Sequence, residues 1–241
     1  MTPAPGPIRA VGVVVPARDE QERIPDCLTA LRGALDRLPA GVARAVCLVL
    51  DRCTDRTAWV AAAEVRDWPW PVDILHNRSA RTVGELRHTG IECLLRGRAP
   101  AETWLLSTDA DSTVPPDWAT GHLRYADAGA DAVAGTVTLD EADGLHPDAL
   151  RRYASVVDSG VTGPAHTHVY AANLGIRGSA YTAVGGFPAV PSGEEHALLR
   201  RLRSGGHPIA APTGLDVRTS ARLDGRAAGG LADLLVSLHP R

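Results

Sequence analysis

The chain has 241 residues, of which 44% are hydrophobic and 4% aromatic, so it can form one large α/β domain with a core mainly of Ala, Val and Leu. Its formal net charge at pH 7 is −3, from 25 Lys and Arg against 28 Asp and Glu. This balance argues against a protein that coats nucleic acid, because such binding is driven by surplus positive charge, but it does not exclude one bound nucleotide.

Strands and helices alternate along the first half of the chain. Apolar runs predict five buried strands, at residues 8–15, 45–50, 72–75, 103–107 and 132–139. We expect Pro16 to end the first of them. Apolar side chains at helical spacing predict helices that begin near Ile24, Ala58 and Thr82. This alternation implies a parallel sheet with right-handed crossovers.

The second half of the chain is less regular. Helical patterns cover residues 147–158, 194–203 and 231–238. Residues 168–172, 209–211 and 215–219 are weaker strand candidates, and the Gly-rich stretch 175–193 is typical of a loop with a short helix. No internal repeat is visible, so we expect a single domain over residues 1–241.

Three acidic segments follow predicted strands. They are Pro-Ala-Arg-Asp-Glu at 16–20, Asp-Arg-Cys-Thr-Asp-Arg-Thr at 51–57 and Thr-Asp-Ala-Asp-Ser at 108–112. Ligands of open parallel sheets bind beyond the carboxyl ends of the strands, so these segments should meet at one edge. Carboxylates that converge repel one another unless a cation or hydrogen-bond donors lie among them, and a hard divalent cation is their natural partner.

Asp109 and Asp111 carry the strongest signal. Residues two apart in an extended segment point the same way, so both carboxylates can face one ligand. A Mn²⁺ or Mg²⁺ ion held there could bridge to the phosphates of a nucleotide diphosphate and neutralise the charge of that leaving group. The alternative is a helix cap in a solvated turn, since Asp and Ser are good caps.

Other candidates could bind the rest of a nucleotide. Asp51, Asp55 and Glu20 can accept hydrogen bonds from a base or from ribose hydroxyls, although Asp55 could instead cap the helix that follows it. Arg87 could reach phosphates or brace Asp109, or it could be an ordinary exposed helical arginine. Three arginines, at 218, 222 and 226, recur every four residues and could clamp a diphosphate or form a solvated basic face.

Glu194 and Glu195 open a predicted helix after a Gly-rich loop. A carboxylate at a helix start is favoured by the helix dipole, which is one explanation for the pair. The other is a general base that takes the proton of an acceptor hydroxyl. Spacing alone does not decide which of the two would act.

Taken together, these segments resemble glycosyltransferase family 2, the inverting enzymes of the GT-A fold. The matching pieces, in family order, are residues 13–20, 51–57, 87–91, 109–111, 185–187 and 193–196. The resemblance implies an α/β, Rossmann-like fold whose central, mostly parallel sheet is flanked by helices. It implies a nucleotide-sugar-binding half over about 8–112 and an acceptor-binding half over about 113–241.

The resemblance also implies roles for individual residues. Glu20, Asp51 and Asp109 are expected to contact the nucleotide, and Asp111, with Asp109, to bind the metal. The donor site implied by the matching segments consists of Pro16, Ala17, Glu20, Asp51, Asp55, Arg87, Asp109, Ala110 and Asp111. The family's base lies in a Glu-Asp pair, so Glu195 takes the position of the Asp here.

The expected activity is therefore transfer of a sugar from a nucleotide-diphosphate donor to the hydroxyl of an acceptor, which could be a small molecule, a glycan or a lipid. One alternative is a nucleotidyltransferase on a related sheet, but the loop at 16–20 lacks the glycines that would cradle a triphosphate. The other is a non-catalytic nucleotide-sugar-binding protein, which would keep the donor-side acids without a base.

The cellular setting is predicted from cysteines and hydropathy. The four cysteines form no C-x-x-C pair and indicate no disulfide framework, which is typical of a reduced, cytoplasmic protein. The sequence shows no signal peptide and no apolar stretch near the roughly 18 residues of a membrane span. An acceptor in a bilayer would have to be reached from the membrane surface, through peripheral contact.

Overall fold

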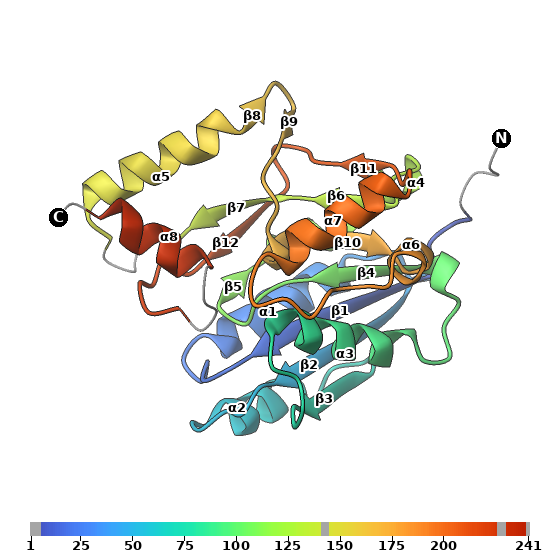
Figure 1. Ribbon diagram of the computed structural model, residues 1–241. Coiled ribbons are helices and arrows are strands. Elements are labelled where there is room, and N and C mark those ends of the chain that lie inside the picture. The colour runs from blue at the N-terminus through green and yellow to red at the C-terminus, as the bar shows by residue number, and fades with distance from the viewer. Residues whose placement is uncertain (1–5, 141–144, 226–229, 240–241) are drawn as a thin grey trace.

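A seven-stranded sheet forms the centre of the computed structural model, which describes residues 6–140, 145–225 and 230–239. In spatial order its strands are β11 (Ile209–Ala210), β6 (Ala132–Ala134), β10 (Leu174–Arg177), β4 (Thr103–Ser107), β1 (Ala10–Ala17), β2 (Ala43–Leu50) and β3 (Val72–His76) (Figure 1). β10 runs antiparallel to both of its neighbours, and every other pair is parallel. The mostly parallel α/β sheet expected from the sequence is confirmed.

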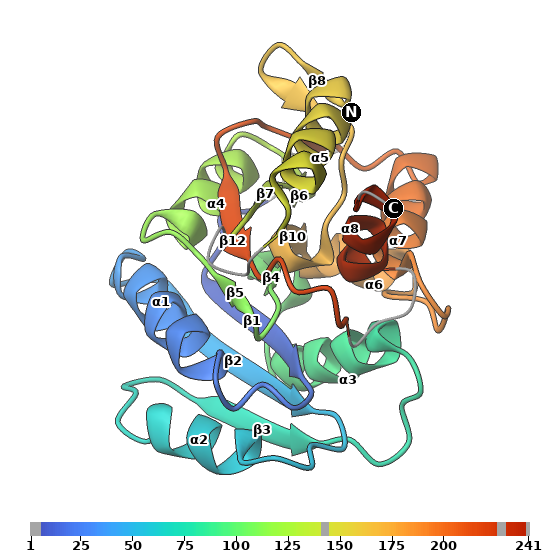
Figure 2. The ribbon, with the colours of Figure 1, turned by 90° about the vertical axis from the view of Figure 1, so that its left-hand side faces the viewer.

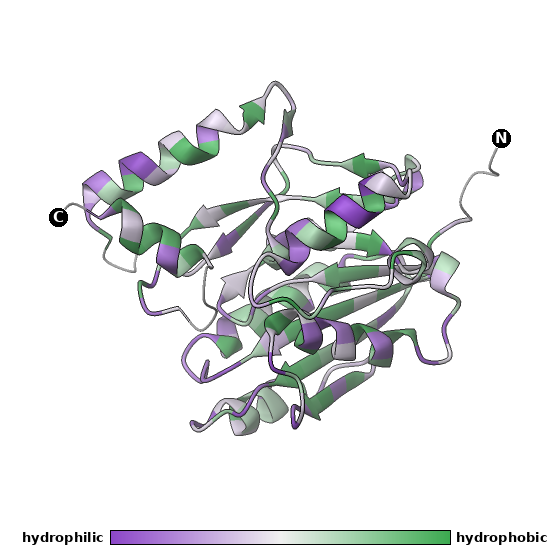
Figure 3. Cartoon of the chain, viewed as in Figure 1, coloured by the Kyte–Doolittle hydropathy of each residue, from purple (hydrophilic) through white to green (hydrophobic). Residues whose placement is uncertain are grey.

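Helices cover both faces of this sheet (Figure 2). One face packs against α1 (Ile24–Asp36), α2 (Thr57–Glu64) and α4 (Trp118–Asp127). The other face packs against α3 (Val83–Leu95), α6 (Gly178–Ala183) and α7 (Glu194–Ser204). Alternate residues of β1 belong to the two cores, so apolar side chains lie on both faces of this strand. Green, the hydrophobic colour, predominates in the strands of this part of the sheet (Figure 3).

The first four predicted strands and the helices between them are confirmed, with one correction. Pro16 does not end β1, which continues to Ala17 and pairs with β2 over its whole length. The backbone N–H of Thr108, directly after β4, donates to the carbonyl oxygen of Val14. The backbone nitrogen of Pro16, two residues further along β1, therefore also faces β4. The ladder with β4 stops at Val14, so the missing N–H of Pro16 removes no ladder bond.

The predicted fifth strand, 132–139, is wrong as a single element. It breaks at Gly135 into β6 and β7 (Thr136–Leu139), and β7 belongs to a second sheet of order β5 (Ser112–Thr113), β12 (Asp216–Thr219) and β7. The buried amide of Asn173 stabilises this break, because its nitrogen donates to the carbonyls of Thr136 and Leu215 at 2.8 and 2.7 Å. The second sheet brings the segment after β12 beside the carboxyl end of β4.

The region around residues 168–177 differs most from the prediction. Residues 168–172 form no strand; the short 3₁₀ turn η3 (Ala171–Asn173) lies there, and β10 follows inside the stretch expected to be a loop. Position 175 of this strand must be a glycine, because a Cβ there would collide with the side chains of His122 and Trp104. Gly175 thus allows close packing within a strand, whereas the Gly-rich sequence predicted a loop.

The remaining elements complete the second half. They are η1 (Pro100–Glu102), α5 (Pro147–Ser159), the hairpin of β8 (Val161–Thr162) and β9 (Ala165–His166), and α8 (Leu231–Leu238). α5 and α8 pack on each other around a small apolar cluster that includes Tyr153 and Leu235, apart from the two main cores (Figure 1). Among the described helices, none has the length and apolar character needed to cross a bilayer.

Candidate active site

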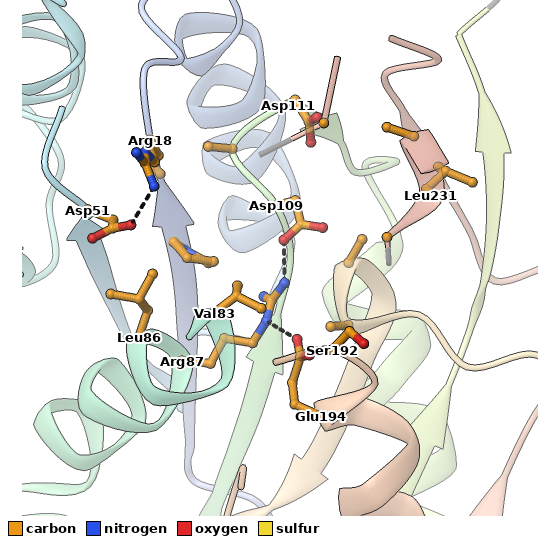
Figure 4. A pocket seen from close by; sticks show the side chains of 18 of the residues that line it. Arg18, Asp51, Val83, Leu86, Arg87, Asp109, Asp111, Ser192, Glu194 and Leu231 are labelled. Carbon is orange, nitrogen blue, oxygen red and sulfur yellow. Dashed lines mark hydrogen bonds and ion pairs between the residues drawn. The ribbon is translucent and has the colours of Figure 1, made fainter. Parts of the chain in front are cut away.

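A pocket of about 660 Å³ lies beyond the carboxyl ends of β1, β2 and β4 (Figure 4). The beginnings of α3 and α7 and the segments around Ser220 and Leu231 complete its wall. It is lined by ten of the residues predicted from the sequence, namely Pro16, Ala17, Glu20, Asp51, Arg87, Asp109, Ala110, Asp111, Glu194 and Glu195. Predicted residues up to 179 positions apart in the chain, Pro16 and Glu195, thus meet in one cavity, at the edge of the sheet where ligands of such folds bind.

Asp51 lies at one end of the pocket, directly after β2. Its carboxylate accepts from Asn77 Nδ2 at 2.6 Å and from Arg52 Nε at 2.8 Å, and Arg18 Nη1 lies 3.6 Å away. Burial alone would raise the pKa of Asp51, but the bonds from Arg52 and Asn77 and the charge of Arg18 lower it overall. Asp51 is therefore a fixed anion, and the arginines beside it add donors to this end of the pocket.

Asp55 does not line the pocket. Its carboxylate accepts from the backbone N–H and hydroxyl of Thr57, at 2.9 and 2.5 Å, and from the backbone N–H of Gln21 at 3.1 Å. These contacts tie the first turn of α2 to the loop after β1. The structure therefore places Asp55 as a residue that holds a helix start, which was the alternative interpretation of the sequence.

A group of possible metal ligands outside the pocket includes the same residue. Oxygen and sulfur atoms of Asp19, Cys53 and Asp55 lie within 4.8 Å of one another. The carboxylate of Asp19 already accepts from the backbone N–H groups of Thr54 and Asp55. These bonds give the three side chains a structural role in joining two loops.

Arg87 is buried on α3 at the centre of the pocket, with 3% of its side chain exposed. Its Nη1 donates to Ser107 Oγ at 2.7 Å, its Nη2 contacts Asp109 Oδ1 at 2.5 Å, and its Nε lies 3.6 Å from Glu194 Oε1 (Figure 4). The predicted brace for Asp109 is present, and an exposed helical arginine is ruled out. Arg87 also links the end of β4 with the start of α7.

Local structure at the start of α3 fixes the position of Arg87. A capping box between Thr82 and Glu85 begins the helix, because each side chain accepts from the backbone of the other. A Cβ on Gly84 would lie 2.5 Å from the carbonyl oxygen of Pro188 and 3.0 Å from Cβ of Glu194. Glycine at this position lets α3 approach the segment before α7, so that Arg87, one turn later, reaches Glu194.

The guanidinium of Arg222 contacts the acidic cluster, formed by Glu20, Asp109 and Asp111, on the side away from Arg87. Its Nη2 lies 2.6 Å from Glu20 Oε1 and 3.0 Å from Asp111 Oδ2, and its Nη1 donates to Glu20 Oε2 at 2.8 Å. Burial raises the pKa of Asp111 to about 6, and the charges of Asp109 and Glu20 add to this against the opposing charge of Arg222. Glu20, Asp109 and Asp111 therefore form one electrostatically coupled group.

Glu194 and Glu195 differ in their surroundings, which the sequence could not reveal. Glu194 is 4% exposed and faces Arg87. The side chain of Glu195 is 18% exposed, and burial, with the neighbouring charge of Glu194, raises its pKa to about 7. Glu195 thus combines access to the pocket with a pKa near neutrality.

Several pocket residues were not predicted, and Arg218, one of the three spaced arginines, does not line the pocket. Arg18 and Arg52 each lie beside a predicted acid, and Tyr170, Ser192 and Leu231 come from loops and helix starts without a sequence signal. The arginines at 218 and 222 share no helix, because β12 ends between them, and Arg218 lines a separate shallow hollow. Arg226 lies outside the described residues.

Comparison with known proteins gave one family and a set of solved structures. A family model described as "Glycosyl transferase family 2" matches residues 12–181, and no match was found among curated proteins. S. aureus TarS 1–349 in complex with UDP-GlcNAc has 15% sequence identity and a TM-score of 0.65 over 90% of this chain. The chain spans 60% of the length of that TarS chain.

Two further structures are similar. The mannosyltransferase PcManGT from Pyrobaculum calidifontis, in complex with GDP-Man and Mn²⁺, has 17% identity and a TM-score of 0.67, covering 98% of this chain and 70% of that one. A mycobacterial protein has 17% identity and a TM-score of 0.58, covering 94% of this chain and 70% of that one. At these identities the likeness concerns the fold.

Proposed function

The chain belongs to glycosyltransferase family 2 and has the GT-A fold, and from this membership we propose that it transfers a sugar from a nucleotide-diphosphate donor to an acceptor hydroxyl with inversion. The observation that carries the proposal is the pocket itself. Glu20, Asp51, Asp109 and Asp111 meet there with a partly exposed glutamate, Glu195, whose pKa is raised to about 7.

The donor is proposed to lie between Asp51 and Asp111. Asp51 and its neighbours Arg18 and Arg52 offer an acceptor and several donors, which suit the edges of a nucleobase or ribose. Asp109, Ala110 and Asp111 lie at the end of β4, where the diphosphate would follow. The similar TarS and PcManGT structures hold UDP-GlcNAc and GDP-Man, which supports the class of donor and leaves base and sugar open.

A divalent cation fits the residues at this end of the pocket. Asp109, Asp111 and Glu20 supply only carboxylate oxygens, the donors that Mn²⁺ and Mg²⁺ prefer. We propose Asp111, with Asp109, as its protein ligands, and the Mn²⁺ in the PcManGT structure supports this choice of ion. When bound, such an ion supplies positive charge that stabilises the leaving diphosphate.

Glu195 is proposed as the general base and Glu194 as a positioning residue. The carboxylate of Glu195 takes the proton of the acceptor hydroxyl while the oxygen of that hydroxyl attacks the anomeric carbon of the donor sugar. The bond from this carbon to the diphosphate breaks on the opposite face. A pKa near 7 leaves a large fraction of Glu195 ionised and still basic enough to accept the proton. Glu194 is buried against Arg87 and keeps that cation in place.

The acceptor is proposed to enter from the side formed by the second half of the chain. Tyr170, Ala171, Ser192 and Leu231 line the pocket there. We propose one domain over residues 1–241, with a donor half over about 8–112 and an acceptor half over about 113–241. The acceptor class, whether small molecule, glycan or lipid, stays open.

The proposal is tested by nucleotide binding and donor hydrolysis with and without Mn²⁺. UDP, GDP and their sugars are screened by thermal shift, because a ligand that binds only the folded state raises the melting temperature. We expect one nucleotide to raise the melting temperature more in the presence of Mn²⁺ than in its absence. Asp111→Asn should abolish this additional rise and the metal-stimulated turnover while leaving the fold intact.

Asp117→Asn serves as the matched control, since Asp117 is exposed just before α4 and lies outside the pocket. It should behave as the unaltered protein. Full metal-stimulated turnover in Asp111→Asn would contradict the proposed metal site, and release of pyrophosphate from a nucleoside triphosphate would point instead to nucleotidyl transfer.

A further inference from the structure

The guanidinium of Arg222 lies where two acidic segments of the pocket meet. Glu20 comes from the loop after β1, Asp111 from the segment after β4 and Arg222 from the segment after β12. Two nitrogens of Arg222 contact both oxygens of Glu20, and its Nη2 is also 3.0 Å from Asp111 Oδ2. One nitrogen thus bridges two carboxylates, as a metal ion between them would.

The two cations of the acidic cluster are held very differently. Arg87 is 3% exposed and also donates to Ser107 and to the carbonyl oxygen of Thr108, so it is part of the fixed frame. The side chain of Arg222 is 21% exposed and lines the pocket, and the bonds found for its guanidinium go to Glu20 and Asp111. Arg222 can therefore leave the carboxylates without disturbing the core.

We propose that Arg222 is an internal stand-in for the divalent cation, one that competes with the metal for Asp111 and is released when metal and nucleotide diphosphate arrive together. In the protein without ligand its single positive charge offsets part of the repulsion among Glu20, Asp111 and Asp109. A cation that takes Oδ2 of Asp111 must displace this guanidinium. Once free, the guanidinium faces the phosphates across the same pocket and pairs with them.

This competition makes an unusual prediction for one substitution. Removing the charge of Arg222 leaves the carboxylates without their competitor, so Mn²⁺ alone should bind more tightly. The same substitution removes a partner for the phosphates, so the nucleotide diphosphate should bind more weakly at saturating Mn²⁺. A residue that only supports the fold would weaken both.

The experiment compares Arg222→Gln with the unaltered protein by titration of MnCl₂ without nucleotide, with free Mn²⁺ measured by electron paramagnetic resonance. We expect the Kd for Mn²⁺ to fall about tenfold. UDP or GDP, whichever the unaltered protein binds, is then titrated by calorimetry at saturating Mn²⁺, and its Kd should rise about tenfold. The double variant with Asp111→Asn should lose the tighter Mn²⁺ binding.

Arg218→Gln is the matched control, because it removes the same charge four residues away, outside the pocket. It should leave both dissociation constants unchanged. Arg222→Lys keeps the charge and should give a Mn²⁺ Kd close to that of the unaltered protein, and circular dichroism checks that each variant is folded.

Two outcomes would overturn the stand-in role. One is a Kd for Mn²⁺ that is unchanged or higher in folded Arg222→Gln, and the other is equally tight Mn²⁺ binding in Arg218→Gln. The second step, in which the guanidinium of Arg222 leaves the carboxylates and pairs with the phosphates, rests on the proposed function. If no nucleotide binds the unaltered protein, that function fails, while the Mn²⁺ titration still decides whether Arg222 competes with a cation.

Discussion

Arg87 Nη2 lies 2.5 Å from Asp109 Oδ1, across 22 residues of sequence. This contact joins the third helix to the end of the fourth strand, at the residue where the acidic segment begins. The same guanidinium lies 3.6 Å from Glu194, so one buried cation connects the proposed donor site with the helix that carries the proposed base. The position of the proposed donor site relative to the proposed base therefore depends on Arg87.

Replacing Arg87 with Met should destabilise the protein. Loss of the guanidinium leaves buried Glu194 and half-exposed Asp109 without their partner, and breaking a buried pair in this way costs about 3 kcal/mol of unfolding free energy. Urea denaturation at pH 7 measures this. Arg81→Met, at an exposed position six residues earlier and just before the same helix, should change the value by less than about 0.5 kcal/mol. A loss below 1 kcal/mol for Arg87→Met would contradict the buried ion pair.

The sequence was most informative where strands are buried on both faces. β1, β2 and β4 are continuous apolar runs, so their ends, and the acids that follow them, could be located from the residues alone. Because parallel strands end at one edge, the meeting of Glu20, Asp51 and Asp109 in one pocket followed from these ends. The pairing of β10 was missed because Gly175 makes its strand resemble a turn.

Contacts between distant segments could not be predicted. Arg222 and Glu20 are 202 residues apart, and only the second sheet, which begins where β6 and β7 part at Gly135, brings them together. The different surroundings of Asp51 and Asp55 could not be predicted either. Both follow the same strand, and only the positions of Asn77 and Thr57 direct one carboxylate into the pocket and the other to a helix start.

A matched pair of substitutions should separate the roles of Asp51 and Asp55. Asp51→Ala removes an acceptor that faces the pocket, so the Kd of the bound nucleotide should rise about tenfold. Asp55→Ala should leave that Kd unchanged and lower the unfolding free energy by about 1 kcal/mol, because the contacts with Thr57 and Gln21 are lost. Calorimetry and urea denaturation measure the two effects. Equal weakening of nucleotide binding by both variants would return Asp55 to the donor site.

The raised pKa of Glu195 gives activity and stability opposite dependences on pH. A general base must be ionised, so the rate of transfer should rise with pH through about 7, and Glu195→Gln should lose both the activity and that rise. The folded protein holds this proton more tightly than the unfolded chain, whose glutamate has a pKa near 4.5, so the stabilising effect is complete below about 4.5 and is lost as pH rises through 7.

Thermal melts of the unaltered protein and Glu195→Gln between pH 5 and 8 check the second half of this prediction. The difference in melting temperature should move in favour of the variant as pH rises, because the glutamine cannot acquire a buried charge. Glu64→Gln, at the exposed last residue of α2, should melt in parallel with the unaltered protein. A rate that rises instead near pH 4.5, with melting curves that keep a constant separation, would mean that Glu195 titrates as an ordinary exposed carboxylate. Activity retained in Glu195→Gln would mean that another group is the base.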